Sequence, residues 1–194
     1  ISEIVPIPAE RDLEGSLIMA TKNGLIKKTK VSEYENIRKS GKIAIKLNEG
    51  DKLIGVGYVK EDAEVLIASS SGKCARFNEK DVRQVGRDSM GVKSMTLEKG
   101  ESVVSMAIIK PESVILTISE NGYGKRTPAS EFRLTSRGTK GVKAGVFNEK
   151  TGGLVGLADV EEDKDLMLIA DNGVSLRTPI KDISLIGRVS QGVR

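Results

Sequence analysis

Residues 121 to 128 read NGYGKRTP and combine an Asn-Gly dipeptide, a second glycine, two adjacent cations and a proline. Asn-Gly is a strong signal for a tight two-residue turn between antiparallel strands, so a hairpin is the first interpretation of this stretch. A phosphate-binding loop and a nucleic-acid contact are the alternatives, because glycine and neighbouring cations also suit a bound anion. The choice depends on whether the stretch occurs once.

The stretch is one of four copies of a longer pattern. The copies occupy residues 19–34, 67–82, 117–132 and 168–183 and align on their turn glycines, which are Gly24, Gly72, Gly122 and Gly173. A second glycine lies 17 to 19 residues further on in each copy, at Gly41, Gly91, Gly141 and Gly192. Successive turn glycines are 48, 50 and 51 residues apart, and self-similarity at such a period indicates a repeat architecture.

Each copy reads as strands. Apolar residues on both sides of residues 22–24 predict a hairpin, residues 42–47 alternate along a third strand, and residues 52–59 supply a fourth apolar run. Four strands in about 50 residues, repeated, are typical of propeller blades. No stretch sustains a helical period over about ten residues. We therefore predict an all-β, propeller-like fold built from repeated four-stranded antiparallel blades.

The repeats divide the chain into units. We expect blades at residues 15–63, 64–112 and 113–164, and a partial blade at residues 165–194. Residues 1–14 are expected to hold the tail strand of a preceding repeat and a connector, because residues 1–7 match the fourth run of the other units. Closure of the last blade by the same segment is the alternative, and the sequence leaves both arrangements open.

Composition narrows the functional classes. The chain has 194 residues, 38% of them apolar, and 31 basic against 27 acidic residues give a net charge of only +4. Cys74 is the single cysteine, which excludes an internal disulfide framework and fits a reducing compartment. The absence of histidine removes the commonest general base and imidazole metal sites. With no apolar run near the roughly 20 residues that span a bilayer, we expect a cytoplasmic protein without a membrane partner.

Two charges recur at fixed distances from the turn glycine. A cation lies four residues after it and a carboxylate nine residues after it in every copy. We predict one structural ion pair per blade, which joins the hairpin to the segment that follows; direct contact of the cation with a ligand is the alternative. The predicted pairs are Lys28 with Glu33, Arg76 with Asp81, Arg126 with Glu131, and Arg177 with Asp182.

The loops around the second glycines are basic. Their cations are Arg38, Lys39, Lys42, Arg87, Lys93, Arg137, Lys140, Lys143, Arg188 and Arg194. Protection of a strand edge by lysine is one interpretation. Four such loops in register, however, place cations at the same position on every blade and form a basic track, while acidic residues concentrate elsewhere. We therefore favour binding to a nucleic-acid backbone.

Three repeat phrases point to a known family. NGYGKRT at 121–127, SGKIAIKL at 40–47 and LIGRVSQGV at 185–193 closely resemble the C-terminal domain of the A subunit of bacterial DNA gyrase, over essentially the whole chain. The C-terminal domain of topoisomerase IV is the near alternative. The resemblance implies a β-pinwheel, in which propeller-like blades exchange a strand with their neighbours and duplex DNA wraps around a basic outer edge to support negative supercoiling. None of the four loops carries the Q-R-R-G-G-K-G motif of the family's first blade.

The resemblance also implies partners. The domain would be a monomeric accessory module, attached to the catalytic core of the same chain and through it to the gyrase B subunit in an A2B2 complex. The parent enzyme would use ATP through that second subunit, with Mg²⁺ at its cleavage core. For this chain we expect no cofactor, no metal and no catalysis, because Tyr34, Tyr58 and Tyr123 lack the arginine that precedes the family's active-site tyrosine. A protein-interaction propeller and a propeller enzyme are the alternative functions.

Overall fold

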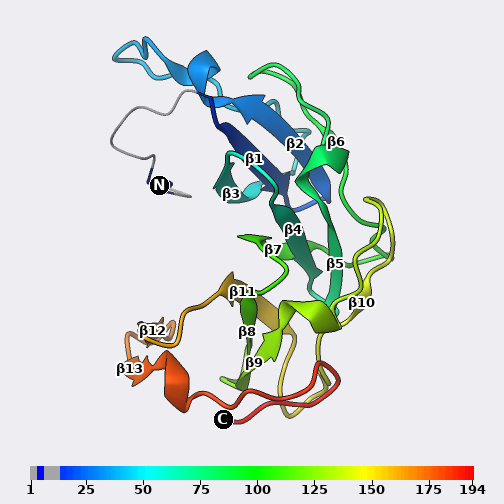
Figure 1. Cartoon of the computed structure of the whole chain (residues 1–194), viewed down its shortest axis with the longest axis vertical. Coiled ribbons are helices and arrows are strands. Elements are labelled where there is room, and N and C mark those ends of the chain that lie inside the picture. The colour runs from blue at the N-terminus through cyan, green and yellow to red at the C-terminus, as the bar shows by residue number, and fades with distance from the viewer. Residues whose placement is uncertain (1–3, 7–13) are drawn as a thin grey trace.

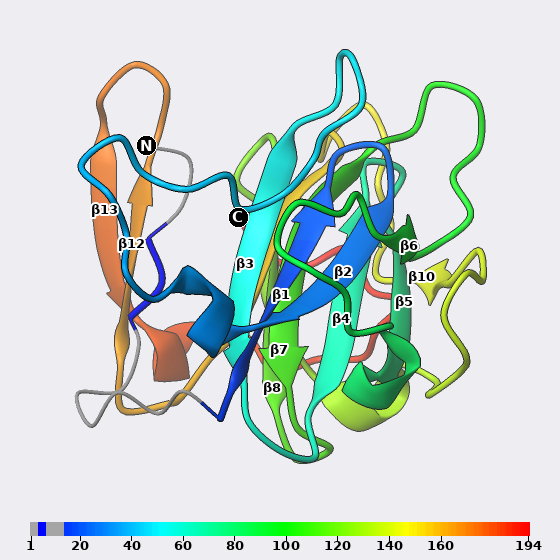
Figure 2. The ribbon, with the colours of Figure 1, turned by 90° about the horizontal axis from the view of Figure 1, so that it is seen from above.

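The structure, a computed structural model, describes residues 4–6 and 14–194, and these residues form thirteen β-strands and four short 3-10 helices. The strands make four antiparallel sheets that follow one another along an arc (Figure 1). Seen from above, strands of successive sheets run along roughly the same axis (Figure 2). The predicted all-β, propeller-like fold is confirmed.

The first sheet shows how a blade is assembled. Its hairpin consists of β1 (Ser16–Thr21) and β2 (Leu25–Lys30), and β3 (Leu53–Val59) pairs with β1. The fourth strand, β6 (Val92–Lys93), comes from the following unit and pairs with β2. The order is β3-β1-β2-β6. The four-stranded blade is therefore confirmed with one correction: its outermost strand belongs to the next unit.

The later sheets repeat this arrangement. The second sheet has the order β10-β5-β4-β7 and consists of β4 (Glu64–Ser69), β5 (Lys73–Asn78), β7 (Val103–Ile109) and, from the following unit, β10 (Val142–Lys143). The third sheet consists of β8 (Val114–Ser119), β9 (Gly124–Pro128) and β11 (Leu154–Asp159), and the last of β12 (Asp165–Ile169) and β13 (Ser175–Pro179). A bridge between Gly124 and Val193 continues the exchange. Strand exchange between neighbouring blades is thus present, as the resemblance implies.

A short 3-10 helix follows each hairpin. The four helices are η1 (Val31–Tyr34), η2 (Glu79–Asp81), η3 (Ala129–Glu131) and η4 (Ile180–Asp182). The residue ten places after the turn glycine is fully buried in two copies, at Val82 and Phe132. Each 3-10 helix turns the chain out of its sheet. The loop that follows the helix then leads back toward the preceding unit.

The stretch NGYGKRTP lies in the hairpin between β8 and β9. Gly122 has a φ of +78°, and its N–H donates to the carbonyl of Ser119 at 3.0 Å. A positive φ is the conformation that glycine adopts readily and other residues avoid. The hairpin interpretation is confirmed.

Residues 42–47 do not form the predicted strand. They have no regular structure, and Ile43 is 66% exposed. The corresponding segments of later copies become β6 and β10 because they pair with β2 and β5 of the preceding unit. Within the described residues, no preceding hairpin offers an edge to residues 42–47, so the alternating pattern finds no partner.

Both faces of the second sheet are buried between its neighbours. Along β4, Val65 and Ile67 pack in one cluster with Ile26 of the first sheet. The intervening Leu66 packs in another cluster with Ile115 of the third sheet. Successive side chains of a strand point to opposite faces, so a strand covered on both sides is apolar nearly throughout. Burial on both faces stacks the units into the arc.

The N-terminal tail lies largely outside the described residues. The expectation for residues 1–14 therefore rests on a few positions, of which Val5 packs against a cluster of the first unit that contains Leu17, Met19 and Val31.

The second glycine of a copy marks a close backbone contact between units. Gly91, next to β6, has a φ of +101°, and a Cβ atom there would lie 2.5 Å from the carbonyl oxygen of Ile26 on β2. Gly141, next to β10, has a φ of +74°, and a Cβ atom there would lie at the same 2.5 Å from the carbonyl oxygen of Cys74 on β5. Only glycine allows the exchanged strand to lie directly on the hairpin before it.

Replacing Gly91 with alanine is expected to weaken the exchange. The substitution combines left-handed strain with a backbone clash, so the free energy of unfolding should fall by about 2 to 4 kcal/mol. Gly100→Ala is the matched control, because Gly100 has a φ of +85° but no atom within 4 Å of the place that a Cβ atom would take. That control should cost only about 1 kcal/mol. Urea denaturation measures both, and equal losses would contradict the proposed clash.

Candidate nucleic-acid interface

The exchanged strands form the outer edge of the arc. In Figure 1, β6 and β10 and the loops that lead to them lie on the convex side, while β3, β7 and β11 face the concave side. The residue two places after the second glycine is an exposed cation in three copies, as Lys93, Lys143 and Arg194. Among the described residues, no hydrogen bond or ion pair engages the Nζ atom of Lys93 or Lys143. Both ammonium groups are free to meet an anionic partner.

The first basic loop presents three of the predicted cations. Arg38, Lys39 and Lys42 are all exposed. The Nζ atom of Lys42 donates to the backbone oxygen of Glu33 at 3.3 Å and to that of Glu35. The loop therefore offers Arg38 and Lys39 to solvent and uses Lys42 to close itself onto η1.

A glutamate lies among the cations of the outer edge. The Oε1 atom of Glu98 is 3.0 Å from Nζ of Lys73 and 3.6 Å from Nζ of Lys140, another predicted contact. The hydrogen bond from Lys73, with the charges of both lysines, holds the pKa of Glu98 below its usual value. This carboxylate occupies the position that an anionic partner of these lysines would take.

The loop arginines are engaged with the backbone of the neighbouring loop. Each arginine lies four residues before the second glycine of its own loop. Its Nη1 atom donates to a carbonyl of the preceding loop, and the accepting residue lies two places after the second glycine of that loop. The donor and acceptor pairs are Arg87 with Ile43, Arg137 with Lys93, and Arg188 with Lys143. The structure therefore gives three of the predicted DNA contacts a role within the fold.

The cations four residues after the turn glycine are paired, but the predicted partners are wrong. The observed pairs are Lys28 with Glu79 at 2.6 Å, Arg76 with Glu64 at 2.6 Å, Arg126 with Glu162 at 2.7 Å, and Arg177 with Asp165 at 2.5 Å. Arg76 also donates to the carbonyls of Ala129 and Phe132, and so braces its hairpin against η3 of the next unit. Removing one partner from such a buried pair costs about 3 to 5 kcal/mol. The structural role holds: the ion pair of Lys28 reaches the following unit, whereas Arg76 and Arg126 pair within their own unit and reach the following one through backbone carbonyls.

Two of the carboxylates nine residues after the turn glycine, those of Glu33 and Glu131, serve the next loop instead. The Oε2 atom of Glu33 accepts the N–H of Arg87 at 2.8 Å, and that of Glu131 accepts the N–H of Arg188 at 2.6 Å. Asp81 contributes its carbonyl, which accepts from Nε of Arg137 at 3.2 Å. Each of these residues ends or lies in a 3-10 helix, which directs it away from its own hairpin.

Two lysines that are buried and have a structural role were not identified from the sequence. Lys27 is 0% exposed, and its Nζ atom donates to the carbonyls of Ala44 at 2.7 Å, Gly86 at 3.3 Å, and Arg87. Burial lowers the pKa of Lys27 to about 8, with the charge of nearby Glu33 acting in the opposite direction. Ala75 and Leu176 occupy the equivalent position in two other copies, and their apolar character is the signal that this position points inward.

Lys125 has the same environment in the third unit. It is 2% exposed, and its Nζ atom donates to the carbonyls of Gly187 at 3.0 Å, Ser190 at 2.9 Å, and Arg188. Burial lowers its pKa to about 8. Each buried ammonium group thus fastens the basic loop of the next unit to the hairpin beneath it.

The family described as DNA gyrase C-terminal domain, beta-propeller, matches four successive segments of the chain, at residues 15–60, 63–110, 113–161 and 164–194. The chain belongs to this family. The resemblance of the repeat phrases is thereby confirmed.

Curated relatives of this gyrase-family chain are named as the A subunit of DNA gyrase. The protein of Halalkalibacterium halodurans is 57% identical over 193 residues, which cover 100% of this chain and 23% of that protein. The protein of Clostridium acetobutylicum is 48% identical over 184 residues, or 95% of this chain and 22% of its own length. The chain thus spans less than a quarter of these relatives.

Solved structures of both paralogous domains share the fold. The C-terminal domain of DNA topoisomerase IV aligns with a TM-score of 0.88 and 25% identity over 97% of this chain and 59% of its own. The DNA gyrase A C-terminal domain aligns with a TM-score of 0.84 and 31% identity over 94% of this chain and 62% of its own.

The tyrosines of this gyrase-family chain contribute to packing and to the surface. Tyr34 donates its hydroxyl to the carbonyl of Ala44 at 3.2 Å. The ring of Tyr58 fills the space beside Gly15, where a Cβ atom would lie 2.3 Å from it. The ring centroid of Tyr123 lies 5.7 Å from Nζ of Lys150, a cation–π distance.

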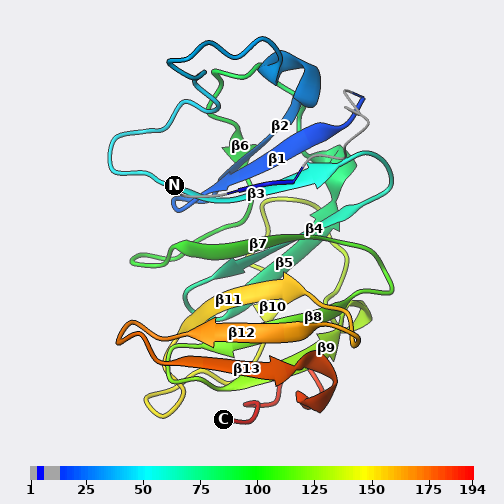
Figure 3. The ribbon, with the colours of Figure 1, turned by 90° about the vertical axis from the view of Figure 1, so that its left-hand side faces the viewer.

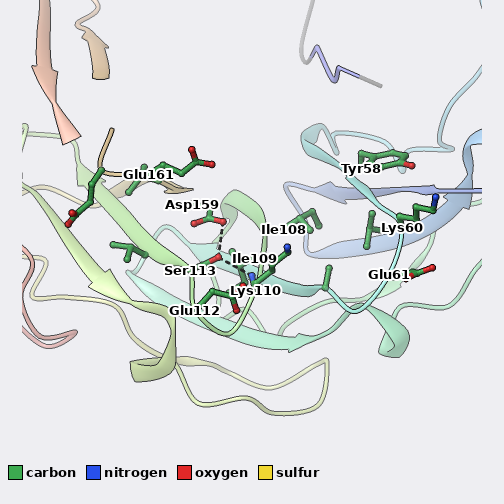
Figure 4. Close-up of a pocket in the computed structure, with 15 residues that line it drawn as sticks. Tyr58, Lys60, Glu61, Ile108, Ile109, Lys110, Glu112, Ser113, Asp159 and Glu161 are labelled. Carbon is green, nitrogen blue, oxygen red and sulfur yellow. Dashed lines mark hydrogen bonds between the residues drawn. The ribbon is translucent and has the colours of Figure 1, made fainter. Parts of the chain in front are cut away.

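The concave side of this gyrase-family chain differs in charge from the outer edge. Figure 3 shows β3, β7 and β11 on this side, and a pocket opens where they end (Figure 4). Its lining mixes Lys110 with Glu112, and the hydroxyl of Ser113 donates to Oδ2 of Asp159 at 2.7 Å. Within the described ranges, no three histidine, cysteine or acidic side chains are grouped to hold a metal ion. Charges of both signs meet here, whereas the exposed Lys93 and Lys143 lie on the exchanged strands of the convex side.

The buried lysines predict a pH dependence of stability. With a folded pKa near 8 against 10.5 for the free side chain, Lys27 binds fewer protons in the folded than in the unfolded chain between these values. Its contribution to the free energy of unfolding therefore rises with pH across this window. The free energy of unfolding of the wild type minus that of Lys27→Met should increase by on the order of 2 kcal/mol between about pH 8 and about pH 10.

Thermal or urea denaturation across this pH range measures the difference. The raised pKa values of Tyr34 and Cys74, both caused by burial, act in the opposite direction but are present in both proteins and cancel. Lys125→Met should behave in the same way. Parallel stability profiles of wild type and variants would contradict the assignment.

Proposed function

We propose that this chain binds the sugar-phosphate backbone of duplex DNA along its convex edge and bends it, as the accessory domain of the DNA gyrase A subunit in support of negative supercoiling. The observation that carries the proposal is the recurrence of an exposed cation at one position of successive units, at Lys93, Lys143 and Arg194. Family membership and the named relatives support it.

The spacing of these cations suits a bent duplex. Bending a site of 20 to 30 base pairs costs on the order of 1 to 6 kcal/mol, which phosphate contacts distributed along an arc have to offset. One cationic position per blade provides such a distribution, and lysine side chains are long enough to follow a phosphate. Phosphate contacts carry no sequence information, so we expect binding that depends little on DNA sequence.

The outer strands carry exposed cations, whereas the concave pocket has charges of both signs. The net charge of +4 is small, yet Lys93 and Lys143 lie on the outer strands, while the concave pocket is lined by carboxylates such as Glu112 together with Lys110. A positive edge on a nearly neutral protein attracts a polyanion to that edge. A protein-interaction propeller would not require this recurrence of cations.

The function of the whole enzyme extends beyond this chain. We infer a parent type II topoisomerase in the bacterial cytoplasm, in which this domain is attached to the catalytic core and acts with the gyrase B subunit in an A2B2 complex. ATP would bind to the B subunit and Mg²⁺ to the cleavage core, and both sites would lie outside this chain. This domain would be non-catalytic and monomeric by itself. None of the described residues forms a helix long and apolar enough to cross a membrane.

The C-terminal domain of topoisomerase IV is the second candidate. The structural alignment with that domain, at a TM-score of 0.88, favours it. Sequence identity favours gyrase, since the curated relatives named above are gyrase A subunits. The two candidates share DNA binding and differ in the DNA geometry that they select.

Neutralising the exposed lysines is expected to reduce the salt dependence of DNA binding. Each lost phosphate contact lowers the slope of log affinity against log salt by about 0.9, so Lys93→Gln with Lys143→Gln should lower it by about 1.8. Lys110→Gln, on the concave side (Figure 4), is the matched control and should leave the slope unchanged. Fluorescence anisotropy with a duplex at several salt concentrations measures this. Salt-independent binding by the wild type would refute the proposal.

Bending and wrapping require a second measurement. A nicked plasmid is religated with the protein bound, and the linking number is read after deproteinisation. A shift of definite sign that disappears in the double variant indicates chiral wrapping along the edge. No shift with the wild type would restrict the function to binding without wrapping.

Removing the acidic group of the outer edge should strengthen binding. Glu98→Gln abolishes the ion pairs with Lys73 and Lys140. Lys140 then becomes available to phosphates, whereas Lys73 keeps its ion pair with Glu101 at 3.6 Å. The affinity for duplex at low salt should rise, and the salt slope should steepen by about 0.9 for each lysine that gains a contact. Glu112→Gln in the concave pocket is the control. Unchanged binding in Glu98→Gln would show that DNA does not reach Lys140.

A further inference from the structure

The loop arginines repeat one geometry in three places. Arg87, Arg137 and Arg188 each donate from Nη1 to a carbonyl of the preceding loop. The accepting residue always lies two places after the preceding second glycine, at residues 43, 93 and 143. The same bond at three equivalent positions, between loops about 50 residues apart, is a property of the repeat and not of one site.

The accepting carbonyls belong to the residues that carry the exposed cations. Arg137 holds the carbonyl of Lys93, and Arg188 holds that of Lys143. A lysine side chain is flexible, so the place where its ammonium group can reach is determined by its backbone. The arginine of the next loop therefore fixes the point from which each free ammonium group projects.

Arg137 and Arg188 are themselves held from the other side. The Nε atom of Arg188 donates to the carbonyl of Glu131 at 3.0 Å, while its backbone N–H donates to the carboxylate of the same residue at 2.6 Å. The Nε atom of Arg137 donates to the carbonyl of Asp81 at 3.2 Å. A guanidinium group presents its donors in a planar fork, so bonds in two directions lock its orientation.

The exchanged strands need this support because they are short. β6 and β10 contain two residues each and pair with the preceding hairpin at two positions. An arginine that turned to a phosphate would give up both of the backbone carbonyls that it holds, and the two-residue strand would lose this support. The arginines are thus better placed to hold the loops than to bind DNA.

We propose that Arg137 and Arg188 are positioning residues: each clasps the backbone of the preceding cationic residue and sets the distance between successive DNA contacts. This inference rests on the proposed function and deepens it. The lysines contact phosphate, and the arginines keep the lysines in a fixed register along the arc. The path of the bent duplex, and not only the affinity for it, depends on these clasps.

The test separates charge from geometry with three single variants. Lys93→Gln should lower the salt slope of duplex binding by about 0.9, because a phosphate contact is lost. Arg137→Gln should leave the slope unchanged but reduce the linking-number shift of a religated nicked plasmid by at least about half, since a register that is no longer preorganised recovers less of the bending cost. Arg137→Lys keeps the charge without the fork and should behave like Arg137→Gln.

Two outcomes would overturn the inference. If Arg137→Gln lowers the salt slope as Lys93→Gln does, or if Arg137→Lys restores the wild-type linking-number shift, Arg137 binds phosphate directly. If Arg137→Gln unfolds, Arg188→Gln with Arg188→Lys provides the same comparison at the next loop. A wild-type chain that does not bind duplex would instead refute the proposed function, so the two failures are distinguishable.

Discussion

The exchange of the outermost strand between units is the constraint on which the structure depends. A two-residue strand such as β6 is too short to be stable by itself, and it exists because the preceding hairpin offers an edge and Gly91 allows the backbones to touch. Exchange places the loops that lead to β6 and β10 on the convex side of the arc (Figure 1). It also makes each blade incomplete without the unit that follows, so the geometry of the edge is a property of neighbouring units together.

The basic residues divide into three groups by what surrounds them. Arg76 is buried in an ion pair and braces one hairpin against the next unit. Lys27 is buried among carbonyls and fastens a loop to the hairpin below it. Lys93 is exposed and free of protein partners among the described residues. The first two groups use their charge for rigidity, and the third presents a charge to a partner from a backbone that the arginine of the next loop, Arg137, holds in place.

Hairpins, repeat period and family were predictable from the sequence, because glycine turns and apolar runs depend on local backbone conformation and burial. The partners of the cations were not. Arg76 was predicted to pair with Asp81, five residues away, but Glu64 lies on the adjacent strand of the hairpin and Asp81 is carried by η2 toward the next loop. Burial of Lys27 was also missed, since a lysine on a strand that also carries Lys28 and Lys30 reads as exposed. Both errors arise because contacts between strands and between units do not follow sequence distance.

The sequence by itself determined that the chain is a β repeat with a glycine turn in every unit and with cations at one recurring loop position. These properties reside in single residues and their spacing. The tertiary structure alone decided which cations are available. Strand exchange places Arg137 against the backbone of Lys93 while it leaves the ammonium group of Lys93 in solvent. The reason is physical: a guanidinium group that meets two carbonyls of a neighbouring unit is satisfied there, whereas a lysine at the edge of the outermost strand has only solvent or a partner to meet.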